Sequence, residues 1–246
     1  MDNFKEVLEN FKKSDNESVN TDYRLFLKEN KILLSQDNIK ELFLTFFKKM
    51  FKKEFEINDD SNQYLQLLLN YFCRNEDFYN SPILIKNLNS PSLCKGLLII
   101  GNYGVGKSKI LKTFEVLFTK YCEFNKNFYF RIYNVMNAVN TFETLENAMQ
   151  RSDFYKKHSK GFKCYDDVKS ERDASIYGKI PIIKDILFSR YENDTRTIFT
   201  CNFDENYPDD YLKAIEEFGS KYDGRIYDRI FEMFNIIVVG GKSFRN

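Results

Sequence analysis

An eight-residue segment sets the strongest constraint on how this chain folds. It reads Gly101-Asn102-Tyr103-Gly104-Val105-Gly106-Lys107-Ser108 and matches the pattern G-x-x-x-x-G-K-[ST] in full. The short apolar run Gly96–Ile100 precedes it, and the amphipathic segment Ser108–Tyr121 follows it. A continuous apolar run of this length is typical of a strand buried on both faces. The segment is therefore predicted to be a turn from a buried strand into a helix.

The residue types of this turn suit the binding of phosphate. Glycines at 101, 104 and 106 let the backbone turn so that its N–H groups surround phosphate oxygens. The helix that follows adds the positive end of its dipole. Lys107 is predicted to reach the β- and γ-phosphates, and Ser108 to hold Mg²⁺. We predict that all eight residues contact the nucleotide. A chance glycine-rich turn is the alternative, which the flanking strand and helix disfavour.

Strands alternate with helices through the rest of the chain. Helical patterns include Lys179–Tyr191 and Asp209–Phe218. This alternation predicts a parallel sheet covered on both faces, that is, a three-layer α/β P-loop fold with a mainly parallel five-stranded sheet. Besides the run before the turn, the predicted strands are Phe128–Val135, Gly161–Tyr165, Thr197–Cys201 and Ile236–Val239.

Helical periodicity alone is found before residue 92. Ser35 is a candidate cap for a helix with an apolar stripe from Ile39 to Phe51, and Ser61 is a candidate cap for a second helix. The stretch Pro82–Pro91 has the composition of a connection. We therefore predict a helical N-terminal region over residues 1–92 and an ATPase core over residues 93–246.

Composition excludes several classes of protein. With 37 Lys and Arg against 36 Asp and Glu and 43% hydrophobic residues, the chain is neither disordered nor polybasic. The five scattered cysteines, among them Cys122, and the single His158 favour neither a disulfide framework nor a zinc site. The chain contains no apolar run of membrane-spanning length and no signal peptide. We expect a reduced, soluble, cytoplasmic protein with no membrane partner.

Polar residues follow two later strands. Asp166 and Asp167 come after the strand predicted to end at Tyr165, and Asn202 follows the strand Thr197–Cys201. At the carboxyl edge of the sheet, Asp166 is predicted to orient Mg²⁺ and Asp167 to polarise a water molecule. Asn202 is predicted to help orient that water beside the γ-phosphate. The alternative for the acidic pair is an Asp-rich loop, and the alternative for Asn202 is a plain turn residue after a strand.

Four segments together resemble the DnaC/IstB-like branch of the AAA+ ATPases. They are the strand and turn from Gly96 to Ser108, the pair Asp166-Asp167, the triplet Thr200-Cys201-Asn202 and the segment Tyr222-Asp223-Gly224-Arg225-Ile226-Tyr227-Asp228-Arg229-Ile230. The ending Gly241-Lys242-Ser243-Phe244-Arg245 is similar to the Gly-x-Ser-x-Arg ending of that branch. The resemblance covers residues 95–245.

The resemblance implies roles for these residues. Gly101 to Ser108 would be Walker A, Asp166 and Asp167 Walker B, and Asn202 sensor 1. Arg225 and Arg229 would be candidates for an arginine finger or a sensor arginine. An arginine finger acts on the site of the neighbouring subunit, so an ATP-dependent homo-oligomer is implied. The alternative is that these arginines only pair with local carboxylates such as Asp223 or Asp228.

The sequence also departs from the family pattern. Walker A has Asn102-Tyr103 and Ser108 where Pro and Thr are usual in AAA+ proteins, and Gly224 is displaced by one position because Asp223 precedes it. Asp167 is one methylene shorter than the usual Glu, which predicts a low rate of hydrolysis. A C-terminal helical lid is not expected.

By resemblance, the chain would bind and hydrolyse ATP with Mg²⁺ and act in DNA replication as a DnaC-like helicase loader. A replicative helicase and single-stranded DNA would be its partners, and the N-terminal region would dock on the helicase. The alternatives are an IstB-like transposition helper with a transposase partner, and a nucleotide-gated binding adaptor with little hydrolysis. The lysine clusters at 48, 49, 52 and 53 and at 156, 157, 160 and 163 are either solvated faces or DNA phosphate contacts.

Overall fold

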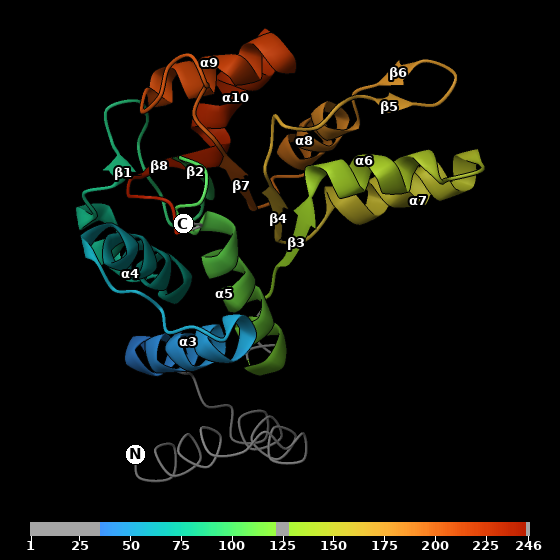
Figure 1. Ribbon diagram of the computed structural model, residues 1–246. Coiled ribbons are helices and arrows are strands. Elements are labelled where there is room, and N and C mark those ends of the chain that lie inside the picture. Colours follow the sequence, from blue (N-terminus) through green and yellow to red (C-terminus); the bar gives the residue numbers. More distant parts are fainter. Residues whose placement is uncertain (1–34, 122–127, 245–246) are drawn as a thin grey trace. The chain divides into compact units, whose positions relative to one another are not determined.

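A computed structural model describes residues 35–121 and 128–244 (Figure 1). The first 34 residues of the predicted N-terminal region, Cys122 and Arg245 lie outside the described residues. The chain forms two compact units. One comprises Met1–Glu56 and Thr113–Tyr129, and the other comprises Ile57–Lys112 and Phe130–Asn246.

The helices and strands carry the labels of Figure 1, and η1 denotes a short 3₁₀ helix. In chain order they are α3 (Gln36–Phe51), α4 (Asp59–Cys73), η1 (Glu76–Asn80), β1 (Leu84–Ile85), β2 (Gly96–Gly101), α5 (Lys107–Tyr121), β3 (Arg131–Asn134), α6 (Val135–Glu143), α7 (Ala148–Ser159), β4 (Lys163–Asp166), β5 (Ala174–Ser175), β6 (Lys179–Ile180), α8 (Ile182–Glu192), β7 (Thr197–Cys201), α9 (Tyr211–Lys221), α10 (Gly224–Met233) and β8 (Phe234–Val239).

The larger unit is built on a mainly parallel sheet with the strand order β1-β8-β2-β7-β4-β3. Strand β2 pairs in parallel with both β7 and β8, β4 pairs with both β7 and β3, and only β1 is antiparallel. The predicted α/β fold and its five parallel strands are thus confirmed. Strand β1 was not predicted, because it lies inside the predicted connection Pro82–Pro91 and is too short to show a pattern.

The six residues of β2 are all buried, as their apolar run predicts. Two glycines let its neighbours approach closely. A Cβ atom on Gly96 would lie 1.9 Å from the Thr197 carbonyl oxygen, and one on Gly101 would lie 2.5 Å from the Val239 carbonyl oxygen. The centre of the sheet therefore requires glycine at both ends of this strand.

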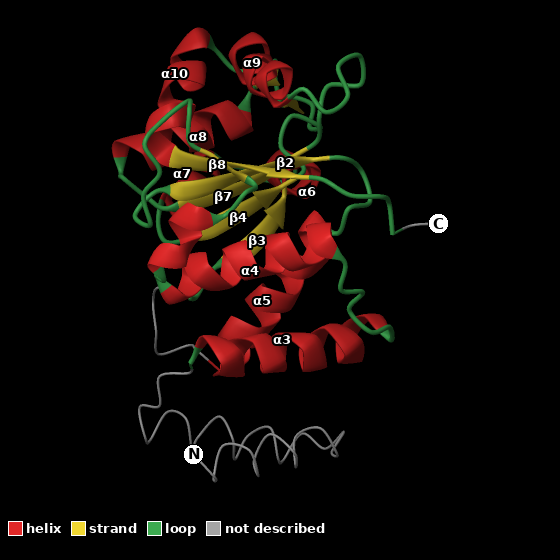
Figure 2. Ribbon diagram, turned by 90° about the vertical axis from the view of Figure 1, so that its left-hand side faces the viewer, coloured by secondary structure: helices red, strands yellow, loops and turns green. Residues whose placement is uncertain are grey.

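Helices cover both faces of the sheet (Figure 2). On one face, Leu98 and Ile100 of β2 belong to a buried cluster to which α6, α7, α8, α9 and α10 all contribute. Side chains alternate between the faces of a strand, so Leu97 and Ile99 point to the opposite face. Figure 2 shows α4 and the start of α5 on that side. The three predicted layers are therefore present.

Local capping explains where several helices begin. Ser35 caps α3 as predicted, since its Oγ accepts a hydrogen bond of 3.2 Å from the Asn38 N–H. The predicted cap of α4 was wrong: Asn58 is the cap, and Ser61 completes a capping box by bonding back to the Asn58 N–H at 2.9 Å. The strand predicted over Phe128–Val135 ends early, because Asn134 caps α6.

In the smaller unit, α3 packs through aromatic residues. The Phe43 ring lies 4.8 Å from the Phe114 ring and 5.4 Å, edge-on, from the Phe55 ring, measured between centroids. Ile39, Leu42 and Phe43 are fully buried. These positions follow the apolar stripe of the sequence, and offset or edge-on ring contacts of this kind stabilise a small core. No helix in the described ranges is both long and apolar enough to cross a membrane.

A buried arginine joins the amino ends of two parallel strands. Arg190 of α8 is fully buried and donates to the Thr197 hydroxyl at 2.7 Å and to the carbonyl oxygens of His158, Gly161 and Arg196 at 2.7–2.8 Å. Gly161 and Arg196 lie just before β4 and β7, and His158 lies near the end of α7, which precedes β4. A buried charge is tolerated when it is hydrogen-bonded, and here three main-chain oxygens and one hydroxyl accept from the guanidinium group.

His158 lies beside this cluster and is 2% exposed. Its Nδ1 is 3.0 Å from the Tyr165 hydroxyl, and its ring packs against Phe154 and Tyr133. Burial, reinforced by the positive charges of Lys163, Lys157 and Arg190, lowers the pKa of His158 to about 3. The folded protein therefore keeps this imidazole neutral at pH values where an unfolded chain would protonate it.

This pKa shift predicts a pH dependence of stability. Between about pH 6.5 and pH 3 the unfolded chain binds one more proton at His158, so stability falls as the pH falls. Urea unfolding is expected to give a free energy of unfolding about 2 kcal/mol lower at pH 5 than at pH 7. His158→Phe keeps the ring packing and should remove most of this difference. An undiminished difference in that variant would assign the effect to other groups.

Candidate functional site

The glycine-rich turn joins β2 directly to α5. Gly104 and Gly106 have φ values of +83° and +91°, in the left-handed region that favours glycine. Val105 between them is 3% exposed, whereas Tyr103 is 56% exposed. The Ile110 N–H bonds to the Gly106 carbonyl at 3.0 Å and closes the first turn of the helix. The predicted strand–turn–helix is therefore confirmed.

Lys107 lies at the mouth of this turn and is 7% exposed. Its Nζ donates to the carbonyl oxygens of Gly101 at 2.5 Å and Asn102 at 2.9 Å, and to Asn202 Oδ1 at 3.0 Å. The ammonium group is thus held by the end of β2 and by the residue that follows β7. An ammonium group with rotatable donors in this place can turn toward an anion bound in the loop.

The first acidic residue connects three segments. Asp166 Oδ1 accepts hydrogen bonds from Ser108 Oγ at 2.8 Å and from Thr200 Oγ1 at 2.6 Å. Ser108 is in the first turn of α5, Thr200 is in β7 and Asp166 ends β4. A hydroxyl and a carboxylate this close are hard oxygen ligands of the kind that Mg²⁺ prefers.

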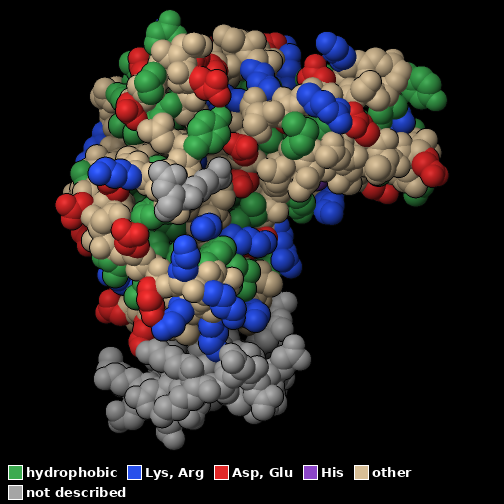
Figure 3. Space-filling model, viewed as in Figure 1, with side chains coloured by type: hydrophobic (Ala, Val, Ile, Leu, Met, Phe, Trp, Pro, Cys, Tyr) green, Lys and Arg blue, Asp and Glu red, His purple; other side chains and the backbone are tan. Residues whose placement is uncertain are grey.

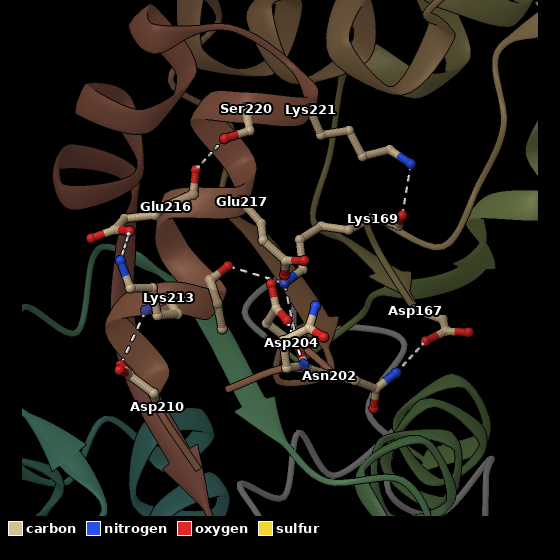
Figure 4. A network of polar contacts seen from close by, with 12 residues as sticks. Asp167, Lys169, Asn202, Asp204, Asp210, Lys213, Glu216, Glu217, Ser220 and Lys221 are labelled. Atoms are coloured by element: carbon tan, nitrogen blue, oxygen red, sulfur yellow. Dashed lines mark hydrogen bonds and ion pairs between the residues drawn. The ribbon is translucent and has the colours of Figure 1, made fainter. Parts of the chain in front are cut away.

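The second acidic residue is held by the neighbouring strand. Asp167 has a φ of +66°, its N–H donates to Thr200 Oγ1 at 2.9 Å, and its Oδ1 accepts a bond of 2.8 Å from Asn202 Nδ2. The Asn202 side chain thus joins Asp167 to Lys107 (the Asp167 bond is seen in Figure 4). Through Thr200, the side chains of Lys107, Ser108, Asp166, Asp167 and Asn202 therefore belong to one hydrogen-bonded network.

Two contributors to this network were not predicted. Thr200 was quoted only as part of a resemblance, although it bonds both acidic residues. Its signal in the sequence was a hydroxyl near the carboxyl end of a buried strand, two residues before Asn202. Asp209, which has a φ of +65°, accepts a hydrogen bond of 2.9 Å from Asn102 Nδ2 and so holds the turn from the outside. No spacing rule indicated that contact.

The segment after β8 also reaches the turn. The Phe244 N–H donates to the Gly104 carbonyl at 3.0 Å. A Cβ atom on Gly104 would lie only 2.2 Å from Ser243 Oγ, so the chain passes directly over this glycine. The role of this ending was missed, because the sequence places it more than 130 residues from the turn that it contacts.

The two candidate arginines lie on α10 and differ in environment. Arg225 is 71% exposed in its side chain and forms an ion pair of 3.2 Å with Asp223, which also pairs with Lys184. Arg229 packs between the rings of Phe188 and Tyr191, 4.4 and 4.3 Å from their centroids. Arg225 contacts Asp223, and both arginines contact aromatic rings of α8. The structure does not bring either guanidinium group to the glycine-rich turn.

Exposed lysines lie along the helix that follows the turn. Figure 3 shows Lys and Arg side chains along α5, where Lys109, Lys112 and Lys120 are exposed. Of the predicted lysine clusters, Lys48 pairs with Glu54 at 2.5 Å. Lys163 is half-buried, and burial lowers its pKa to about 8. Local charge of this kind attracts anionic ligands even when the net charge is near zero.

These features define a P-loop fold of the AAA+ type, with a helical region before it. The DnaC helicase loader has the same fold: its crystal structure matches 75% of this chain and 93% of its own, at 19% sequence identity and a TM-score of 0.52. Structures of DnaI and of a candidate primosome component from Streptococcus pyogenes serotype M3 are also similar. Their identities are 21% and 16%, their TM-scores are 0.48 and 0.49, and the matches cover 75% and 76% of this chain and 88% and 84% of theirs. No protein-family model matches the chain, and neither does any curated protein sequence.

The close packing around Gly104 predicts that one added methyl group at this position destabilises the protein. Gly104→Ala combines a left-handed φ with a clash against Ser243, so it is expected to lower the free energy of unfolding by about 1–3 kcal/mol. Gly224→Ala is the matched control, because no atom lies within 4 Å of its Cβ position, and it should leave stability unchanged or slightly higher. Urea unfolding measures both. Equal stability of the two variants would contradict the close contact.

Proposed function

We propose that this chain binds ATP with Mg²⁺ and hydrolyses it. The observation that carries the proposal is the single network that joins Lys107, Ser108, Asp166, Asp167 and Asn202 at the carboxyl edge of the sheet. These are the groups that phosphoryl transfer to water requires, namely a phosphate-binding ammonium, ligands for a metal ion, and a base with its orienting amide.

The residues present fit ATP and Mg²⁺. The two glycines with positive φ give the turn the backbone that surrounds phosphate oxygens, and the ammonium group of Lys107 beside them is bonded mainly to neutral oxygens. Ser108 and Asp166 would hold the metal ion, which when bound neutralises charge on the phosphates. The eight residues Gly101 to Ser108 would hold the phosphates through main-chain N–H groups and the Lys107 side chain.

In this proposal Asp167 takes a proton from the attacking water while Asn202 fixes its carboxylate. Asp167 is shorter than a glutamate, so its reach depends on the backbone at its left-handed φ of +66°. We therefore expect slow hydrolysis. A nucleotide-gated adaptor with little hydrolysis is the second candidate function, and the short carboxylate is the observation that favours it.

Asp167→Asn tests this assignment. The amide retains the size of the side chain but cannot accept the proton, so binding of a fluorescent ATP analogue should be unchanged while turnover falls about 100-fold or more. Lys107→Ala is the contrasting variant and should lose nucleotide binding. If Asp167→Asn turns over ATP at the wild-type rate, Asp167 is not the base; if wild type binds ATP without any turnover, the adaptor is the better description.

We also propose that Arg225, rather than Arg229, acts on the nucleotide of a neighbouring subunit in an ATP-dependent homo-oligomer. Its side chain is 71% exposed, pairs with Asp223, which has Lys184 as a second partner, and lies over a single aromatic ring, that of Phe188, at 5.2 Å. Arg229 is held by two aromatic rings. An arginine that acts in trans must be able to leave its own subunit's surface, and only Arg225 meets that condition.

Two arginine variants separate these roles. Arg225→Ala should lower ATP turnover at least about tenfold without loss of stability or of nucleotide binding. Arg229→Ala should instead lower the melting temperature, since it removes two cation–π contacts. Turnover is measured with and without single-stranded DNA, and molecular size at the same protein concentrations. Wild-type turnover by Arg225→Ala would contradict its role in trans.

We propose that the process served is DNA replication, with a replicative helicase as protein partner and single-stranded DNA as the nucleic acid. The support is the shared fold with the DnaC helicase loader. An IstB-like transposition helper with a transposase partner has the same site. Stimulation of turnover by purified replicative helicase, and not by transposase, is the expected result that separates the two.

A further inference from the structure

The turn after β4 has an unusual backbone. Asp167 and Lys169 both have positive φ values, +66° and +79°, although neither is glycine. Side-chain-bearing residues adopt this conformation only when surrounding contacts hold them there. The turn carries Asp167, so whatever holds the turn also sets the position of that carboxylate.

Lys169 is the residue through which the turn is held. Its Nζ donates to the carbonyl oxygens of Asn202 at 3.2 Å and Ala214 at 3.0 Å, and it forms an ion pair with Glu217 (Figure 4). The Lys169 side chain is only 10% exposed. Three donors of one ammonium group therefore connect the turn to the end of β7 and to α9.

The main chain of Lys169 is held as well. Its N–H donates to the Tyr222 hydroxyl at 3.1 Å, and its carbonyl accepts a bond of 2.6 Å from Lys221 Nζ. The Tyr222 hydroxyl in turn donates to the buried Glu171 at 2.6 Å. Both the side chain and the backbone at this position are thus fixed against α9 and the residue that ends it.

Two lysines donate hydrogen bonds to Asn202, one to its main-chain carbonyl and the other to its side-chain amide oxygen. Lys169 bonds its main-chain carbonyl, while its side-chain amide lies between Lys107 and Asp167. Among the described residues, the hydrogen-bond partners of Lys169 lie outside the turn Gly101–Ser108, so its effect on that turn is indirect. A change at Lys169 would move the backbone of Asn202 and the carboxylate of Asp167 together.

We propose that Lys169 is a positioning residue for hydrolysis: it fixes Asn202 and Asp167 relative to each other by anchoring both to α9. This inference rests on the proposed ATPase function. Lys169 does not touch the phosphates in this arrangement, so its loss should affect the rate of hydrolysis and leave nucleotide affinity nearly unchanged.

The test compares two lysines that each pair with a glutamate of α9. Lys169→Met keeps the length of the stem but removes the three donors. Lys213→Met is the matched control, because Lys213 pairs with Glu216 at 2.7 Å on the exposed side of the helix (Figure 4). The maximal turnover rate should fall at least about tenfold in Lys169→Met, with the affinity for a fluorescent ATP analogue within about threefold of wild type. Lys213→Met should match wild type in both.

A double-mutant cycle identifies the route of the effect. If Lys169 acts through Asn202, adding Lys169→Met to Asn202→Ala should change turnover by no more than about twofold. Multiplicative losses would contradict that route. Glu217→Gln leaves the carbonyl contacts of Lys169 in place and should give a smaller loss in the same direction. Circular dichroism and thermal unfolding would reveal whether Lys169→Met fails to fold. In that case, the turnover rate of Glu217→Gln still tests the positioning role.

The outcomes separate this inference from the proposed function. If the wild-type protein hydrolyses ATP and the Lys169→Met variant does so at the same rate, the positioning role alone is overturned. A wild-type protein that binds ATP but never hydrolyses it overturns the ATPase proposal and the positioning role with it. A fall in affinity equal to the fall in rate would show that Lys169 shapes the nucleotide-binding loop instead.

Discussion

The parallel pairing of β2 with a strand on each side is the constraint on which the rest of this structure depends. It places the carboxyl ends of β2, β4 and β7 at one edge, although these strands are distant in sequence. Gly96 and Gly101 make the pairing possible, because any larger residue would meet a neighbouring carbonyl oxygen. The glycine-rich turn, the acidic pair and Asn202 are therefore brought together by the pairing of the strands.

Within that edge, a few atoms are shared by several partners. One oxygen of Asp166 serves two hydroxyl groups, the Thr200 hydroxyl serves both acidic residues, and Asn202 lies between two lysines and Asp167. Sharing of this kind makes the positions of the groups interdependent, so single substitutions are expected to have non-additive effects.

Much of this arrangement could be predicted from the sequence, because the signals were local. The match over Gly101 to Ser108 fixed the strand–turn–helix, and the rule that parallel strands end at one edge placed Asp166, Asp167 and Asn202 there. The capping of α3 by Ser35 was a local signal too. The alternation of apolar strands and amphipathic helices identified the layers for the same reason.

What could not be predicted depends on contacts between distant residues. The choice of Asn58 over Ser61 as a cap is a competition between neighbours that only geometry decides. The two-residue strand β1 exists because β8 offers it an edge. Nothing in the spacing of Lys169 indicated that its ammonium group would bond the carbonyl after β7, since a lysine after an acidic pair is ordinarily a solvated surface residue.

The buried Arg190 has a consequence for how this sequence can vary. Its acceptors at Gly161 and Arg196 are main-chain oxygens, which every amino acid supplies. The side chain at position 196 can therefore change without loss of this contact, whereas Gly161 has a left-handed φ of +72° that favours glycine, and no other residue presents the five donors of a guanidinium group at position 190. A saturation library should consequently tolerate fewer replacements at position 190 than at position 196. Arg190 lies at the edge of the sheet opposite the glycine-rich turn, so tolerance to change there is separable from the proposed activity.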